Sequence, residues 1–301
     1  LTLTGSGAIT LPNLTTATTD SLSKIDFSGY SGSGNITTGA LDLGLKDLTV
    51  IGGTGNDIID TSLFVSGDTS IDGGAGNDKI TIALATTDTL VGGEGTDTLS
   101  TSTAIATAGN VSGFEVLDIT GAVSQDMDNL SGNTFTKVEF GGNVATTVSD
   151  ASADVTTVVI DGDAQDTKTF DRKTDTSSDS LNVTLQNTAA ANLTVNDEET
   201  INITSTEAAS TITTLTAADA TKLTISGSEN TTVTNFTGIY LAEVDASAAT
   251  GVVSIGNTAN TSETAMTITA GPGGLTALGS SAADTMSGAS GDDSLTGGAG
   301  N

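Results

Sequence analysis

The sequence predicts an all-β fold, a parallel β-solenoid of the β-helix or β-roll type, with rungs of about 21 residues. Three observations predict it. A nonapeptide of the form G-G-x-G-x-D-x-(apolar)-x occurs three times between residues 52 and 100. Short apolar segments recur along the chain at nearly constant spacing. Glycine, serine, asparagine or aspartate follows most of these segments, and these residues favour turns. A fixed period near 20 residues is typical of solenoids.

The apolar segments are the expected strands, one for each rung. In chain order they are residues 25–27, 48–50, 69–71, 90–91, 116–119, 138–140, 158–160, 181–185, 201–203, 223–225, 244–246 and 266–268. The rung positions used to measure the spacing in the second half are Leu117, Val138, Val158, Val183, Ile201, Leu223, Val244 and Met266, separated by 18 to 25 residues. Apolar residues two apart face the same side of a strand, so each rung is expected to fill a narrow core.

The three nonapeptides begin at Gly52, Gly73 and Gly92, which are 21 and 19 residues apart. Glycines permit a tight turn that points carbonyl oxygens inward, and the aspartate at the sixth position adds an anionic oxygen. Calcium prefers ligands of this kind. Copies that lie about one rung apart fall on the same edge of a solenoid. We therefore expect a ladder of calcium sites along one edge, with no metal on the other.

The nonapeptide returns at the end of the chain. Degenerate copies begin at Gly279, with Asp284 at the sixth position, and at Gly288, with Asp293. The sequence ends within a further copy, so we expect a piece of a longer protein. The predicted organisation is a solenoid with calcium-binding rungs over residues 1–100, a continuing solenoid over 101–278, and the start of a second array over 279–301.

Acidic residues also gather within residues 161–180, in the longest spacing between strands. They are Asp161, Asp163, Asp166, Asp171, Asp175 and Asp179. We expect an insertion loop here. A solvated loop, a further calcium site that uses Asp161 and Asp163, and a lattice contact are all open interpretations of it.

Composition excludes several classes of function. The chain has 37 acidic and 8 basic residues, a net charge of −29 that opposes binding to nucleic acid or to anionic membranes. Without histidine or cysteine, zinc protease sites and Ser-His-Asp triads are absent. Only Lys168, Arg172 and Lys173 form a basic group in the sequence. No apolar run is long enough to span a membrane. We expect a protein that is not an enzyme.

The nonapeptides resemble the calcium-binding repeats of RTX proteins. Together with the threonine-rich segments 113–120, 199–204 and 242–248, they resemble the lattice region of Caulobacter-type bacterial surface-layer (S-layer) proteins. The resemblance implies type I secretion, calcium-driven folding outside the cell and self-assembly into a two-dimensional lattice on the bacterial cell surface. It also implies anchoring to cell-surface polysaccharide through a region outside this chain.

The RTX resemblance also implies two sets of calcium ligands, each drawn from two successive turns. The first set is Gly53, Gly55, Asp57, Gly73, Ala75 and Asp78; the second is Gly74, Gly76, Asp78, Gly92, Glu94 and Asp97. Asp78 would then bridge two ions, so Asp78→Ala is predicted to empty two sites and Asp97→Ala one. Asp284 and Asp293 are weaker candidates in the second array.

Three functions remain open on the sequence alone. The first is the self-assembling surface-layer protein. The second is a calcium-binding RTX adhesin or biofilm-matrix protein. The third is a β-helix polysaccharide lyase or epimerase, which the scarcity of basic and aromatic residues disfavours.

Overall fold

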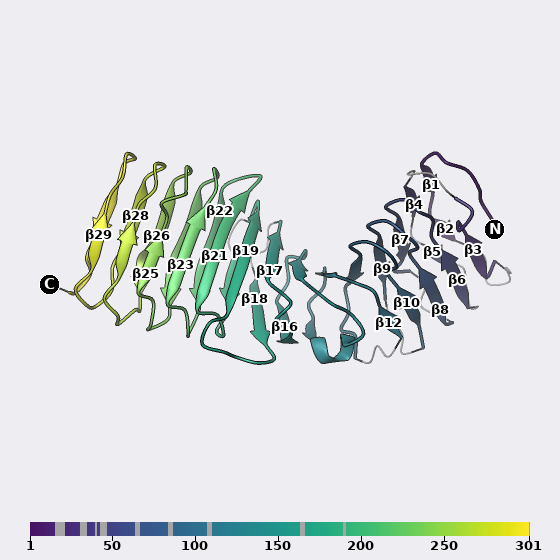
Figure 1. Cartoon of the computed structure of the whole chain (residues 1–301), viewed down its shortest axis with the longest axis horizontal. Helices are drawn as coiled ribbons and strands as arrows, with labels where there is room; N and C mark the ends of the chain where they lie inside the picture. The colour runs from purple at the N-terminus through teal and green to yellow at the C-terminus, as the bar shows by residue number, and fades with distance from the viewer. Residues whose placement is uncertain are drawn as a thin grey trace. The chain divides into compact units, whose positions relative to one another are not determined.

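The computed structural model describes residues 1–15, 22–30, 35–39, 41–42, 47–63, 67–83, 87–106, 110–162, 166–188 and 191–300. The chain divides into two compact units, residues 1–138 and 139–301, which are described separately. Each is a parallel β-solenoid, and the predicted all-β solenoid fold is confirmed. In Figure 1 the strands of each unit follow one another in chain order, and from β6 onward successive strands belong alternately to two sheets.

In the first unit, one sheet contains β1 (Ile9–Leu11), β4 (Ile36–Thr38), β7 (Ile58–Thr61), β9 (Lys79–Ile82), β11 (Thr98–Thr101) and β13 (Val116–Ile119). Of these, β7, β9 and β11 directly follow the three nonapeptide turns. The opposite sheet holds β3 (Lys24–Asp26), β6 (Leu48–Ile51), β8 (Thr69–Asp72), β10 (Thr89–Val91) and β12 (Val111–Ser112). A small sheet pairs β2 (Leu14–Thr15) with β5 (Leu41–Asp42). β14 (Ser124–Asp126) precedes a 3-10 helix, η1 (Met127–Leu130), and β15 (Lys137–Phe140) crosses the unit boundary.

In the second unit, one sheet contains β17 (Thr157–Asp161), β19 (Ser180–Gln186), β21 (Thr200–Thr206), β23 (Lys222–Ser226), β25 (Glu243–Asp245), β27 (Thr267–Thr269) and β29 (Thr285–Ser287). The other contains β16 (Thr146–Ala151), β18 (Thr167–Arg172), β20 (Ala191–Thr194), β22 (Ser210–Thr216), β24 (Thr231–Thr237), β26 (Val253–Asn260), β28 (Leu275–Leu278) and β30 (Ser294–Thr296).

The core of each unit is a stack of aliphatic side chains in register. In the first unit Ile59, Ile80, Leu99 and Leu117 occupy equivalent positions of neighbouring strands, and each is 0% exposed. Burial of each such side chain stabilises the fold by about 1.5–3 kcal/mol. One rung alone cannot enclose these side chains, so stability depends on the neighbours above and below.

The structure corrects the expectation of one strand per rung. In the described ranges the rungs from β7 onward have two strands each, and the two before them have three, because β2 and β5 form the small third sheet. The strands overlooked in the second half, such as β22 and β24, are rich in threonine on their outward faces. Threonine favours strands through its branched Cβ, which suits these positions. In both strands the buried apolar residues are three positions apart, Ile212 and Leu215 in β22 and Val233 and Phe236 in β24, so the period-two pattern of a strand is interrupted.

Two of the predicted rung positions are also displaced by two residues. Val183 pairs with Ile203, where Ile201 was predicted, and Val244 pairs with Ile268, where Met266 was predicted. A shift of two residues keeps the same side chains pointing inward, so alternation alone does not distinguish the two registers.

The predicted acidic loop over 161–180 is wrong for its central part. Residues 167–172 form β18, which pairs with β16 and β20 as an ordinary rung strand. Its alternation places Lys168 and Phe170 in the core, and both are at most 1% exposed. Asp161 is the last residue of β17 and is exposed. Asp163 lies outside the described residues.

In the part of the chain that the structure describes, no helix is long and apolar enough to cross a membrane.

Candidate calcium site

The three nonapeptide turns stack directly on one another along one edge of the first unit. The strands that follow them pair with Ile59 opposite Ile80 and Ile80 opposite Leu99, which brings equivalent turn residues together despite the unequal spacing. A backbone bridge between Ala75 and Glu94 joins the third positions of two turns. The edge therefore forms a ladder in which each turn faces the next.

The aspartates at the sixth positions form a column of buried carboxylates. Asp57, Asp78 and Asp97 are at most 1% exposed. The backbone N–H of Asp57 donates to Asp78 Oδ1 at 2.7 Å, and that of Asp78 donates to Asp97 Oδ1 at 2.7 Å. Each aspartate thus holds the preceding turn through one of its two oxygens.

The three aspartates differ in the hydrogen bonding of their second carboxylate oxygen, Oδ2. Asp57 Oδ2 accepts a hydrogen bond from the Gly53 N–H at 2.9 Å. Asp78 Oδ2 and Asp97 Oδ2 are buried and have no hydrogen-bond partner. The backbone explains the difference, because Gly74 and Gly93, the residues equivalent to Gly53, adopt positive φ angles of 98° and 120°. A buried anionic oxygen without a partner is costly, so these two positions require a cation or a proton.

Each unpartnered oxygen lies beside a carbonyl oxygen of the next turn. A Cβ built on Gly73 would lie 2.6 Å from Asp78 Oδ2 and 2.3 Å from the Gly92 carbonyl oxygen. The two oxygens are therefore at most about 5 Å apart, a separation that one calcium ion bridges with bonds of 2.3–2.6 Å. Glycine at the first position leaves this space open.

The electrostatics of the column favour the same conclusion. Burial raises the pKa of Asp78 to about 7, and repulsion from Asp57 and Asp97 adds to the shift. Burial also raises the pKa of Asp57 and of Asp97. Stacked carboxylates without nearby positive charge destabilise one another, and a divalent cation removes that repulsion.

Several predicted carbonyl ligands also hold the turns together. The carbonyl oxygens of Gly53, Gly74 and Glu94 accept hydrogen bonds from Ala75, Glu94 and Gly76, at 3.0, 2.9 and 2.8 Å. The carbonyl oxygens of Gly55 and Gly76 lie against the glycine one turn further on. A carbonyl has two lone pairs, so a hydrogen bond leaves capacity for a metal. Within the described ranges, no three acidic side chains converge on one point, so an ion here depends on these carbonyls.

The weaker candidates at the end of the chain have a different environment. Asp284 accepts the backbone N–H groups of Met266 and Ser280, at 2.8 and 2.9 Å. Asp293 accepts those of Leu275 and Ala289, at 2.9 and 2.8 Å. Both oxygens of each carboxylate are therefore satisfied by the backbone, as they are in Asp57. In this arrangement the two aspartates fasten one turn to another.

Sequence reasoning missed one member of the column. Glu115 follows no nonapeptide, yet its Oε2 accepts the Asp97 backbone N–H at 2.8 Å, the place that the next aspartate would take. Its position 18 residues after Asp97, one β-roll turn, is the only signal in the sequence that indicates it.

The fold and the turn geometry define a parallel β-solenoid with calcium-binding turns. The model of the RTX calcium-binding nonapeptide repeat family matches four segments, residues 49–63, 65–81, 82–102 and 278–301. The chain thus carries RTX calcium-binding repeats, and Ca²⁺ is their cofactor. No curated protein and no solved structure is significantly similar to the chain.

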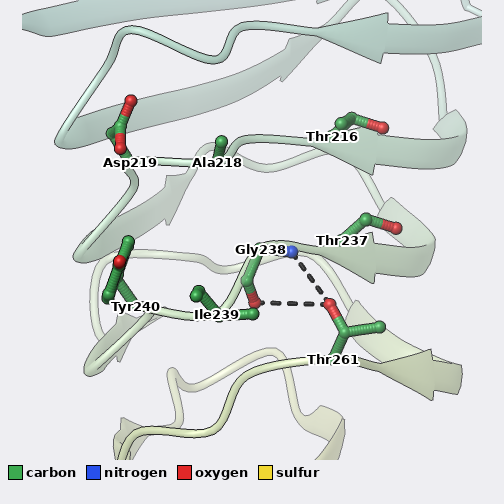
Figure 2. A pocket seen from close by; sticks show the side chains of 8 residues that line it. All are labelled: Thr216, Ala218, Asp219, Thr237, Gly238, Ile239, Tyr240 and Thr261. Carbon is green, nitrogen blue, oxygen red and sulfur yellow. Dashed lines mark hydrogen bonds between the residues drawn. The ribbon is translucent and has the colours of Figure 1, made fainter.

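A separate concavity lies on the second unit, on turns that follow strands of one sheet. It has a volume of about 320 Å³ and is lined by Thr216, Ala218, Asp219, Thr237, Gly238, Ile239, Tyr240 and Thr261. Figure 2 shows these side chains on three successive turns, with the Thr261 hydroxyl bonded to the backbone of Gly238. Tyr240 is 52% exposed and Ile239 43%, although the core takes most large apolar side chains.

Proposed function

We propose that the chain is the lattice-forming part of a secreted bacterial surface-layer protein, which folds when it binds calcium outside the cell. The observation that carries the proposal is the pair of buried, unpartnered oxygens of Asp78 and Asp97 in the ladder. Without calcium these charges oppose folding; with calcium they stabilise it by mass action wherever free calcium exceeds the Kd.

Self-assembly and surface location rest on the resemblance to surface-layer lattice regions and on the repeat architecture. Calcium also neutralises part of the net charge of −29, which otherwise keeps copies of the chain apart. We propose that the chain has no catalytic role, since it lacks histidine and cysteine and has only 8 basic residues.

Electron microscopy of the purified protein tests the lattice. We expect ordered sheets in millimolar calcium and dispersed particles after chelation. Circular dichroism on the same samples reports calcium-dependent folding separately. A protein that folds with calcium yet stays dispersed at every concentration would exclude the lattice and leave the folding switch intact.

The concavity around Tyr240 favours a second candidate, the calcium-binding adhesin. An exposed tyrosine ring offers a flat apolar surface to the C–H face of a sugar, and Asp219 can accept hydrogen bonds from sugar hydroxyls. The volume of about 320 Å³ is at the lower end of the range for small-ligand sites. Binding of the folded protein to immobilised neutral glycans, lost in Tyr240→Ala and retained in Tyr240→Phe, would support this candidate. Glycan binding by Tyr240→Ala that is as tight as binding by Tyr240→Phe would exclude this candidate.

A further inference from the structure

The carboxylate column extends one turn beyond the nonapeptides. Val116 pairs with Thr98, so Glu115 stands in register with Asp97 immediately before the strand. The N–H of Asp97 donates to Glu115 Oε2 at 2.8 Å, which repeats the bonds that Asp57 and Asp78 donate to the next aspartates. Glu115 therefore occupies the place of the sixth-position aspartate in this turn.

The turn of Glu115 also supplies a carbonyl oxygen in the expected place. A Cβ built on Gly92 would lie 1.9 Å from the Gly113 carbonyl oxygen and 2.8 Å from Asp97 Oδ2. Gly73 meets the same two kinds of oxygen, from Gly92 and Asp78. The oxygen of Asp97 that points into this space is buried and without a hydrogen-bond partner. Two acceptor oxygens that face each other with no proton between them repel unless a cation lies there.

The turn departs from the nonapeptide because it is shorter. Glu115 lies two positions after Gly113, whereas Asp97 lies five positions after Gly92, and the RTX match ends at residue 102. The longer glutamate side chain, in register with Asp97, replaces the aspartate of a full turn. The short turn has no equivalent of the third-position carbonyls of Ala75 and Glu94.

We propose that Asp97, Gly113 and Glu115 form a further binding position for a hard divalent cation such as Ca²⁺, at the end of the ladder. The position has fewer protein oxygens than those between two nonapeptides, and Glu115 is only partly buried. It therefore binds calcium more weakly than the position between Asp78 and Asp97. Asp97 then bridges two ions, as predicted for Asp78, so each of the two aspartates is a ligand of two calcium ions.

The test is the number of calcium ions bound per chain, measured by isothermal titration calorimetry and by equilibrium dialysis with metal analysis. Samples are kept at a concentration where sedimentation shows monomers, so the outcome does not depend on lattice assembly. Glu115→Gln removes the charge but retains an oxygen that accepts the Asp97 N–H. Glu263→Gln, an exposed residue of the second unit, makes the same chemical change away from the ladder.

We expect Glu115→Gln to lose one ion, the most weakly bound, while Glu263→Gln matches the unaltered protein. Asp78→Asn and Asp97→Asn are expected to lose equal numbers of ions. If circular dichroism shows that Glu115→Gln does not fold, the comparison of these two variants tests the proposed binding position instead. An unchanged ion count in folded Glu115→Gln, or a smaller loss in Asp97→Asn than in Asp78→Asn, would overturn the proposal.

Discussion

Replacing Asp78 with asparagine is expected to stabilise the calcium-free first unit at pH 8. The unpartnered Oδ2 of Asp78 is buried, and burial raises the pKa of the carboxyl from an ordinary 3.8 to about 7. This shift of roughly 3 pH units, at about 1.4 kcal/mol each, corresponds to on the order of 4 kcal/mol of destabilisation by the charged form. Asparagine has almost the same shape and no charge, so it removes most of this cost.

Urea unfolding at pH 8, followed by circular dichroism in chelator and in saturating calcium, measures the effect. Asp78→Asn should raise the free energy of unfolding in chelator and reduce the additional stability that calcium provides. Asp57→Asn is the matched control, because both oxygens of Asp57 accept backbone N–H groups and an amide satisfies only one of them. If Asp78→Asn in chelator is no more stable than the unaltered protein, the unpartnered charge is not what calcium relieves.

Other outcomes follow from the same structure. Without calcium, stability of the first unit should fall as pH rises from about 4 to 7, because folded Asp78 retains a proton that the unfolded chain releases; saturating calcium should reverse the trend, and pH-dependent urea midpoints test both. Gly74→Ala should cost roughly 1–3 kcal/mol of unfolding free energy, since φ is 98° and the new Cβ would lie 2.3 Å from the Gly53 carbonyl oxygen. Arg172→Met, which leaves the buried Glu198 without its 2.7 Å ion pair, should destabilise the second unit by about 3–5 kcal/mol, equally with and without calcium.

The solenoid fold was predictable because its signals are local and repeated. The nonapeptide specifies a turn followed by a buried apolar residue, and the regular spacing of apolar segments specifies a rung. The sequence analysis did not predict threonine-rich strands such as β22 and β24, because their buried apolar residues are three positions apart (Ile212 and Leu215, Val233 and Phe236), which interrupts the period-two alternation of a strand. The sequence did not predict the exact strand register at Ile203 and Ile268, because a shift of two residues leaves the alternation of inward and outward side chains unchanged.

For the candidate site, the sequence alone indicated calcium and placed Asp57, Asp78 and Asp97 on one edge, where the structure shows them stacked, since oxygen-rich glycine turns at rung spacing are a local pattern. Only the tertiary structure decided which carboxylates lack a partner. Asp57 and Asp78 occupy the same position of the same motif, but Gly74 has a positive φ angle and Gly53 does not. Of these two aspartates, therefore, only Asp78 has a carboxylate oxygen without a hydrogen-bond partner. Only the structure brings Glu115 into the column, because its place depends on strand register across a shortened turn. Hydrogen bonding and burial depend on contacts between turns, which no single turn encodes.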